Sequence, residues 1–307
     1  MANQSIPFSE PLTFPGHWNA GVARRSTVQE PPIQVHRLGP NTIMLRQSKT
    51  LSYEAPFLYL LFGRERAVLW DTGATADPSA FPLRTTIDAL IREWLAEHPC
   101  DPYELIVAHT HAHGDHIAAD GQFTDRPQTT IVGHGVDAVQ AFFHIDGPAG
   151  TGVLDLGDRV LDIFPIPGHQ AASVAVYDPW SGMLLTGDTV YPGRLYVSDY
   201  PAFVTSLTRL RDFVHEHPIS AVLGCHVEMT TRPGREYPLG ATYQPHEASL
   251  VWSPAHIDRV WQASHTARTP GIHRHRDFTI VHGQSTRVIV PLMVRGILWK
   301  VGYRLRG

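Results

Sequence analysis

The chain has 307 residues, of which 43% are hydrophobic and 18% are charged, and its formal net charge is −4. This composition is typical of a globular protein with a substantial core and excludes a largely disordered chain. Lys and Arg form no basic stripe, so a nucleic acid is excluded as the main partner, because phosphate binding needs clustered cations.

The N-terminal residues 1–30 are rich in Pro, Ser and aromatic residues without any period, which predicts an irregular arm. Residues 1–14 lack a basic start followed by a long apolar stretch, so no secretory signal is expected. The chain has only two cysteines, Cys100 and Cys225, which is no disulfide framework. Together these features favour a reducing, cytoplasmic location.

Residues 31–307 are predicted to form one domain in which strands and helices mix and helices cover sheets. Apolar runs bounded by turn residues predict strands, in chain order, at Gln34–Leu38, Thr42–Arg46, Phe57–Phe62, Ala67–Trp70, Leu105–Ala108, Thr130–Val132, Val160–Ile166, Ser173–Tyr177, Met183–Leu185 and Ala221–Leu223. Helical spacing predicts helices at Ala80–His98, Gly135–Phe143, Ala202–His215 and Pro254–Ser264. The late apolar segment Val288–Val301 is too short and too charged for a membrane span, so a buried strand or helix and no membrane partner are expected.

The strongest chemical signal follows the strand at 105–108 directly, in the segment Thr110-His111-Ala112-His113-Gly114-Asp115-His116. His111 and His113, two residues apart, project to the same side of an extended segment and can reach one ion. Asp115 and His116 lie past the turn at Gly114, which suits a second ion. A polar loop with solvent-facing histidines is the alternative, but three histidines and an aspartate in this order favour a metal site.

Three further segments place a candidate ligand beside a glycine, just past the end of an apolar strand. They contain His169 in Pro-Gly-His, Asp188 in Gly-Asp-Thr and His226 in Gly-Cys-His. Each is weak alone, because glycines are common at strand ends. Together they supply two more imidazoles and one more carboxylate, and both groups are ordinary zinc ligands.

Taken in order, these residues resemble the full ligand set of the metallo-β-lactamase superfamily, and Asp71-Thr-Gly73 resembles the motif that precedes the first helix there. The resemblance covers residues 40–230 and implies a four-layer αββα sandwich with the site at one edge of its two sheets. It implies that Asp188 bridges two ions and that Asp71 orients the ligand loop, although a simple turn aspartate is the alternative. The implied ligands are His111, His113 and His169 for one ion, and Asp115, His116 and His226 for the other.

The chemistry expected of such a site is hydrolysis, because two divalent ions lower the pKa of a shared water until hydroxide exists near neutral pH. Zinc is expected, with iron and manganese as alternatives, and Asp115 is expected to hold the bridging hydroxide as well as to ligate. An aspartate at 188 resembles the glyoxalase II, lactonase and nuclease branches, so a small ester, lactone or thioester is expected rather than a β-lactam. Tyr191 resembles a tyrosine that polarises the substrate carbonyl in the lactonase branch; wall packing is an equal alternative.

Two other classes of function stay open. One is an oxidoreductase similar to persulfide dioxygenases, which bind one iron on the same fold, and the other is a non-catalytic binding protein. The aromatic segments Phe8–Trp18 and Tyr237–Trp252, the second within a C-terminal extension of about 230–307, are predicted to cover the site and favour an apolar acyl group. Packing on the body or a homodimer contact is the alternative. Glu228 is expected in a solvated loop.

Overall fold

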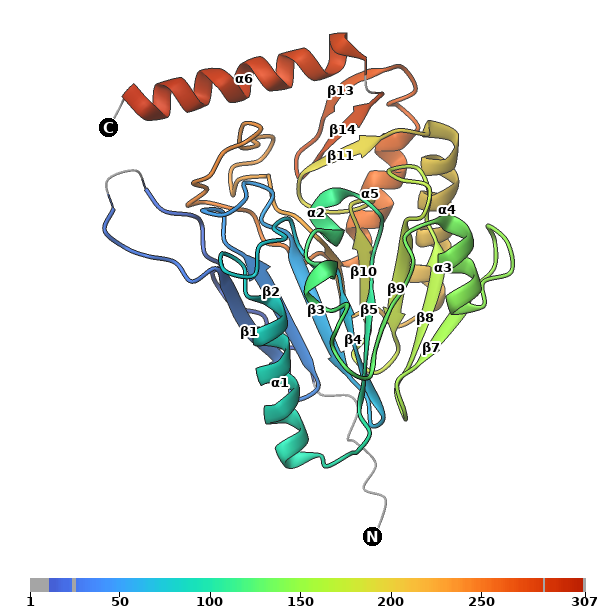
Figure 1. The fold of residues 1–307 in the computed structure, drawn as a ribbon. Helices are drawn as coiled ribbons and strands as arrows, with labels where there is room; N and C mark the ends of the chain where they lie inside the picture. The colour runs from blue at the N-terminus through green and yellow to red at the C-terminus, as the bar shows by residue number, and fades with distance from the viewer. Residues whose placement is uncertain (1–10, 24–25, 284, 306–307) are drawn as a thin grey trace.

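The structure is a computed structural model that describes residues 11–23, 26–283 and 285–305. Two large sheets pack face to face, and helices lie on the outer face of each, so the molecule has four layers (Figure 1). The predicted αββα sandwich is confirmed. A third, small sheet and the C-terminal helix lie at one end of the sandwich.

The first sheet has six strands in the order β1-β2-β3-β4-β5-β6. Their bounds are β1 Ile33–Gly39, β2 Thr42–Gln47, β3 Phe57–Phe62, β4 Arg66–Trp70, β5 Glu104–Ala108 and β6 Thr129–Ile131. Strands β1 to β4 form an antiparallel meander, whereas β4, β5 and β6 run parallel. Helix α1, Leu83–Glu97, makes the crossover from β4 to β5 that a parallel pair requires.

The second sheet has the order β12-β10-β9-β8-β7, and the small sheet has the order β11-β14-β13. The strands are β7 Gly152–Asp155, β8 Val160–Pro165, β9 Val174–Asp178, β10 Met183–Gly187, β11 Arg194–Val197, β12 Ala221–Gly224, β13 Gly271–Arg274 and β14 Thr279–His282. The remaining helices are α2 Gly114–Ile117, α3 Val136–Phe143, α4 Tyr200–Glu216, α5 Pro254–Ser264 and α6 Thr286–Leu305.

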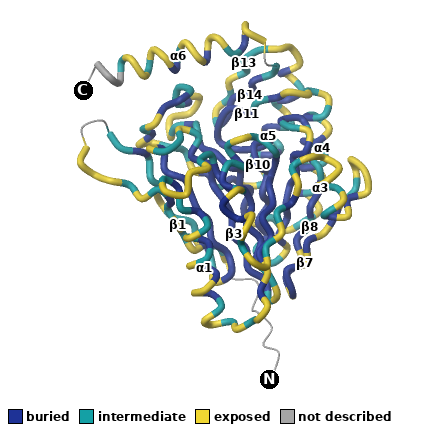
Figure 2. Tube along the Cα trace, in the orientation of Figure 1, coloured by how far each residue is buried: buried dark blue, intermediate teal, exposed yellow. Residues whose placement is uncertain are grey.

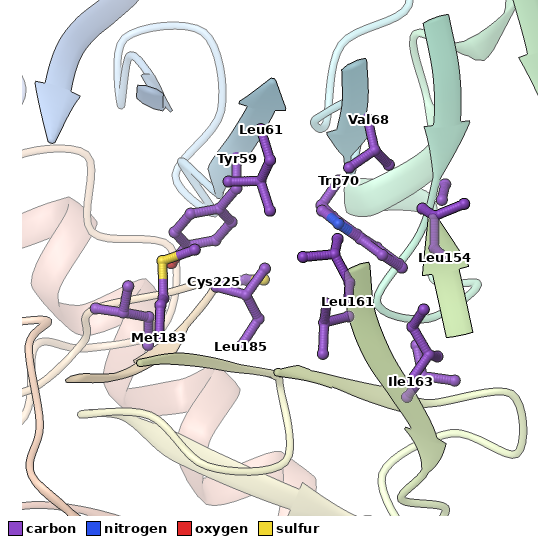
Figure 3. Packing of buried hydrophobic residues seen from close by; sticks show 14 of the residues in the cluster. Tyr59, Leu61, Val68, Trp70, Leu154, Leu161, Ile163, Met183, Leu185 and Cys225 are labelled. Carbon is purple, nitrogen blue, oxygen red and sulfur yellow. The ribbon is translucent and has the colours of Figure 1, made fainter. Parts of the chain in front are cut away.

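The continuous apolar runs in the central strands contribute side chains to two cores, because successive side chains of a strand point to opposite faces of the sheet. In β3, Tyr59 and Leu61 pack into the core between the two sheets, which Figure 3 shows from close by, whereas Leu58 and Leu60 pack toward α1. A third core lies between the second sheet and helices α4 and α5. Figure 2 shows this buried interior running through both sheets.

Every predicted strand and helix is present, with bounds that differ by a few residues. Strands β7, β11, β13 and β14, of four residues each, were not predicted. The late apolar segment forms α6, but the expectation that it is buried holds only for one side, through Val288 and Leu292. Met293, Ile297 and Leu298 are exposed on the other side. In the described part of the chain, no helix is long and apolar enough to cross a membrane.

Candidate metal centre

The predicted ligands lie on loops that follow the carboxyl ends of β5, β8, β10 and β12, except Asp115 and His116, which lie in the short helix α2. Asp71 follows β4. In this fold, those loops meet at one edge of the sandwich. The seven predicted ligands gather there into two groups whose ligand atoms lie within 4.8 Å of one another. The first group is His111, His113 and His169; the second is Asp115, His116, Asp188 and His226.

Glycine allows two of these loops to approach their neighbours closely. Gly187 precedes Asp188 with a φ of +51°, and a Cβ there would lie 2.9 Å from the Thr110 Cβ. Gly168 precedes His169 with a φ of +137°, and its Cβ would lie 2.5 Å from the Cα of Phe203 in α4. A side chain at either position would push a ligand loop away from the site, so both glycines are required by the backbone conformation.

In the first group, three ring nitrogens converge on one point. His113 Nδ1 lies 3.1 Å from His111 Nε2 and 2.9 Å from His169 Nε2. The other ring nitrogen of His169 lies 2.9 Å from the carbonyl oxygen of Tyr196, to which it can donate. Such an outer hydrogen bond fixes the tautomer that leaves the facing nitrogen free to bind a cation. Nitrogen ligands at about 2.0–2.1 Å from a zinc ion are compatible with this spacing.

The second group mixes carboxylates and imidazoles. Asp115 Oδ2 lies 3.3 Å from His226 Nε2 and 3.5 Å from His116 Nε2, and the two Nε2 atoms are 3.3 Å apart. His226 Nδ1 lies 2.9 Å from the carbonyl oxygen of Glu54. His116 and His226 are buried, while Asp115 keeps 23% of its side chain exposed. Asp115 can therefore face both this group and a molecule entering from solvent.

Asp188 lies between the two groups. Its Oδ2 is 3.8 Å from His169 Nε2 on one side and 3.4 Å from His226 Nε2 on the other. Its Oδ1 is buried and has no hydrogen-bond partner among the described residues. A buried carboxylate oxygen without a donor is costly. A cation on each side of Asp188 would satisfy both oxygens, so the donor set and this orphaned atom fit a pair of divalent ions.

Asp71 is fully buried behind the ligands and accepts hydrogen bonds from several of their neighbours. Its Oδ1 accepts from the Thr110 backbone N–H at 2.7 Å, and its Oδ2 lies 2.9 Å from His116 Nδ1. The Cys225 thiol, next to His226, donates to the same Oδ2 at 3.2 Å. Asp71 thus ties together the β5 and β12 loops and holds the ring of His116 with its Nε2 toward the site.

The pKa values of the site groups follow from burial and mutual charge. Burial lowers the pKa of His111 well below its ordinary value and lowers the pKa of His169, which favours the neutral imidazole that a metal requires. For His116, burial also acts to lower the pKa, but Asp71 and Asp188 outweigh it and raise the pKa well above the ordinary value. A cation that binds His116 would therefore have to displace a proton, and its affinity would fall as the pH falls.

An open cavity of about 450 Å³ reaches the two groups from solvent, which is the size of a small-molecule site. Tyr191 lies in its wall, and its hydroxyl donates to the carbonyl of Arg194 at 2.5 Å and to Glu228 at 3.3 Å. The hydroxyl is thus engaged within the wall, and a catalytic role for Tyr191 stays a prediction. The expectation for Glu228 is wrong: it lines the cavity and forms a buried ion pair with Arg194.

Sequence reasoning missed several residues of this cavity. Tyr53 and Glu54 line it from the loop before β3, and Tyr196 lines it from β11. None lies in a motif, and β11 itself was not predicted. Of the aromatic segments expected to cover the site, the second contributes Leu239 to the cavity. In the first, Pro15–Trp18 and Ala20 line a different hollow, and Trp18 packs against Phe57. Phe8 lies outside the described residues.

A second histidine cluster lies behind the centre. His109 Nε2 and His134 Nε2 lie 2.9 Å and 2.7 Å from the two carboxylate oxygens of Asp120, which also accepts from Thr72 at 2.7 Å. Each of these ring nitrogens can donate to Asp120, so the cluster is satisfied as a hydrogen-bonded support beneath the ligand loop.

The model of the metallo-beta-lactamase superfamily matches residues 54–248, which include all seven predicted ligands and well over half of the chain. The chain belongs to this superfamily. Superfamily membership agrees with the order of the ligand-bearing loops and with the four-layer fold.

Curated relatives of this superfamily member match only part of its length. A hydroxyacylglutathione hydrolase from Anaeromyxobacter dehalogenans is 29% identical over 174 residues, 53% of this chain and 60% of that protein. A hydroxyacylglutathione hydrolase from Rhizobium meliloti is 30% identical over 53% of this chain and 64% of that protein. The chain thus spans less than two thirds of the length of these relatives. An acyl-coenzyme A thioesterase from Gallus gallus is 36% identical over 84 residues, 25% of this chain and 29% of that protein.

Solved structures with the same fold include a metallo-beta-lactamase from Pontibacter korlensis and the DIM-1 metallo-beta-lactamase. The first has a TM-score of 0.51 at 15% identity and covers 76% of this chain and 99% of that chain. The second has a TM-score of 0.53 at 14% identity and covers 78% of this chain and 100% of that chain. At these identities the likeness establishes the fold alone.

Proposed function

We propose that the protein is a metal-dependent hydrolase that cleaves a small ester, lactone or thioester with two divalent ions, zinc being the expected metal. The observation that carries the proposal is the pair of ligand groups joined by Asp188, with its buried Oδ1 left without a donor. Relatives named as thioester hydrolases support the choice of reaction. When bound, the two ions would supply a hydroxide at neutral pH and polarise the substrate carbonyl.

In this proposal, the position of each residue in the site sets its role. The seven ligands hold the ions, and Asp71 keeps His116 in the orientation that binding needs. Asp115, partly exposed in the cavity, accepts a hydrogen bond from the attacking water and orients it. Burial raises the pKa of Tyr191 well above its ordinary value, so this residue stays a neutral phenol. It can donate to a substrate oxygen only by leaving the Arg194 carbonyl.

The first prediction concerns the ligands themselves. His113→Ala and Asp188→Ala should each abolish hydrolysis and lower the bound metal, because each removes a donor that no neighbour replaces. Bound metal per chain and turnover on a panel of lactones, aryl esters and thioesters measure both effects. The matched control is His273→Ala, because His273 and His275 share the i, i+2 spacing of the ligands but lie outside the cavity. Unchanged metal content and turnover in the ligand variants would defeat the assignment.

The same assay distinguishes the alternative oxidoreductase. One iron per chain with oxygen uptake on a persulfide, and no turnover on the panel, would replace the hydrolase by a dioxygenase. Two zinc ions per chain with ester or thioester turnover supports the hydrolase.

A further inference from the structure

Helix α6, which lies across one end of the sandwich (Figure 1), carries an apolar stripe on its exposed side. Half of the large hydrophobic side chains that are exposed in the described part of the chain belong to this one helix, and Figure 2 shows exposed residues along it. Their spacing places them on one face of a helix. Such a continuous stripe, unlike scattered hydrophobic residues, is typical of an interaction surface. The α6 stripe consists of Val290, Met293, Val294, Ile297, Leu298 and Val301, which are 46–66% exposed.

The charge at this end of the chain is opposite to that of the rest. Residues 278–307 contain five Lys and Arg residues and neither Asp nor Glu, so their net charge is +5. Because the whole chain carries −4, residues 1–277 carry −9. Arg295 forms an ion pair with the body, whereas Arg287 and Lys300 are exposed and have no carboxylate within ion-pair distance among the described residues. The α6 stripe is therefore bordered by cations, which suits an anionic partner.

This charge disfavours the pairing of two copies of α6. An antiparallel pair that overlays the two stripes would bring position 287 of one helix beside position 304 of the other, and both are arginines. A parallel pair would bring each cation beside its own copy. Like charges at such positions destabilise a helix pair. In addition, a single helix on the surface is a convex ridge, which a protein partner would have to match with a groove, whereas a bilayer needs no matching shape.

We propose that the α6 stripe docks the protein on a membrane surface that contains anionic lipids, with α6 lying in the plane of that surface. From the sequence alone no membrane partner is expected, because the segment is too short and too charged to span a bilayer, and no described helix could cross one. Such a helix can still lie at the boundary between headgroups and acyl chains, with its apolar side inward and its Lys and Arg side chains at the phosphates. Trp299 and Tyr303, in the same helix, are of the residue types enriched at that boundary.

Docking in this orientation would place the cavity of the candidate metal centre beside the lipid. Ile289 of α6 lines the cavity, and Lys300 Nζ lies 6.0 Å from the centre of the Tyr53 ring. A Cβ at Gly296 would lie 2.4 Å from the carbonyl oxygen of Leu239, so the helix lies directly against the cavity wall to which Tyr53 and Leu239 belong. An apolar ester taken up by the bilayer would then be concentrated beside the site of the proposed hydrolase. The docking itself does not depend on hydrolysis.

The test is sedimentation of the full chain with sucrose-loaded vesicles at low salt. Wild type should bind vesicles of phosphatidylcholine with about 30% phosphatidylglycerol at least about tenfold more tightly than vesicles of phosphatidylcholine alone. Ile297→Asp should weaken binding to the anionic vesicles at least about tenfold, because it puts a carboxylate into the middle of the stripe and against the anionic surface. The matched control is Val136→Asp, at an exposed valine that begins α3, and it should bind as wild type does.

Two further variants test the charge and do not alter the stripe. Arg287→Gln and Lys300→Gln each remove one cation, so each should weaken binding to the anionic vesicles by about fivefold at low salt. The difference from wild type should vanish at high salt, because salt screens exposed charges. Arg92→Gln removes the same charge from an exposed position of α1, which lies well away from α6 (Figure 1), and should leave the affinity unchanged.

Sedimentation velocity of the protein without vesicles identifies a different occupant of the stripe. A wild-type dimer that Ile297→Asp dissolves, without any binding to vesicles, would assign the stripe to a second copy of the chain and overturn the proposal. Failure of wild type to bind anionic vesicles, or equal binding by wild type and Ile297→Asp, would overturn it as well. Turnover of soluble esters is measured in parallel, and its absence in wild type would count against the proposed function while leaving the docking surface in place.

Discussion

Asp71 shows how a single buried residue positions a predicted metal ligand. It is fully buried, and its Oδ2 lies 2.9 Å from His116 Nδ1 and 3.2 Å from the Cys225 sulfur. Its backbone has a φ of +68°, so the carboxylate reaches these groups from a turn at the end of β4. The short Asp71-Thr-Gly73 segment thus connects the first sheet to the ligands on β5 and β12.

We predict that Asp71→Asn lowers metal affinity, turnover or both by about 10- to 100-fold, because an amide orients His116 less firmly than a carboxylate does. Metal titration and kcat/KM on the best ester measure the change. Asp125→Asn, at an exposed ion pair with Arg84, provides the control and should have no effect. If Asp71→Asn kept the metal affinity and the kcat/KM of the wild type, Asp71 would have only a structural role in the turn.

Lys49 gives a prediction for the pH dependence of stability. It is 1% exposed in a cluster with Arg46 and Glu247, and burial lowers its pKa from 10.5 to about 8 despite the opposing charge of Glu247. Because the folded pKa is the lower one, the unfolded chain binds more protons between pH 8 and 10.5. The contribution of Lys49 to the free energy of unfolding therefore rises across this window, by about 3 kcal/mol in total.

This contribution should disappear in Lys49→Met. Denaturant unfolding gives the free energy of unfolding of the wild type and of the variant at each pH from 7.5 to 10.5. The contribution of Lys49 is the difference between these two free energies as the pH changes. The chain has one other lysine, the exposed Lys300, so Lys300→Met is the matched control. A constant difference between wild type and Lys49→Met over this range would show that Lys49 titrates normally in the folded state.

At the scale of elements, α6 is joined to the body by few contacts for its length. Val288 and Leu292 are its buried hydrophobic side chains in the described part of the helix. Arg295 donates from its two terminal nitrogens to the carboxylate and to the carbonyl of Glu236, both at 2.7 Å. Ile289, on the same helix, lines the cavity. Among the described residues, the position of this part of the cavity wall thus depends in part on the packing of Val288 and Leu292 and on the Arg295–Glu236 ion pair.

Arg295→Ala should loosen α6 without unfolding the sandwich. Arg295 is 40% exposed, so the pair is worth about 1 kcal/mol, and amide hydrogen exchange in α6 should become roughly fivefold faster. Exchange in β3 and β10 should not change, because those strands lie in the central cores. Arg287→Ala, an exposed arginine on the same helix, serves as the comparison. Slow exchange in α6 after loss of Arg295 would mean that other contacts hold the helix.

At the scale of the whole molecule, the candidate metal centre lies where loops of the two sheets meet. Its ligands come from loops of both sheets, and Tyr59 in β3 adds a hydrogen bond of 2.6 Å to the Gly224 carbonyl at the end of β12. Ions that bind the folded chain but not the unfolded chain stabilise the fold in proportion to the logarithm of their concentration over Kd. The sandwich should therefore lose stability when the ions are removed.

Ions present at 1,000 times their Kd stabilise the fold by about 4 kcal/mol. In a chain of this size, the loss of that free energy on chelation should lower the Tm by about 10 °C. Thermal unfolding with and without a chelator measures the shift. Asp188→Ala should show a much smaller shift, since it holds metal poorly. Equal Tm values for loaded and chelated wild type would contradict a structural contribution of the ions.

The sequence by itself determined most of the elements and the candidate ligand set. Strand β3 could be predicted because a run of six apolar residues must be buried on both faces, and both cores confirm it. The segment from His111 to His116 could be predicted because its spacing is local. His169, Asp188 and His226 followed because each lies beside a glycine just past an apolar strand, and because the ordered set resembles the ligand set of the superfamily. All of these inferences use short stretches of chain.

Only the tertiary structure decided what surrounds those ligands. The pairing of Glu228 with Arg194 joins the loop after β12 to the start of β11, 34 residues away in the sequence. It turned an expected solvated residue into part of the cavity wall. Glu54 and Ile289 reach the same cavity from opposite ends of the chain. No local sequence pattern predicts such contacts, because they depend on how the strands pair and how the layers pack. The charge and shape of the cavity, and hence its selectivity, therefore belong to the folded molecule.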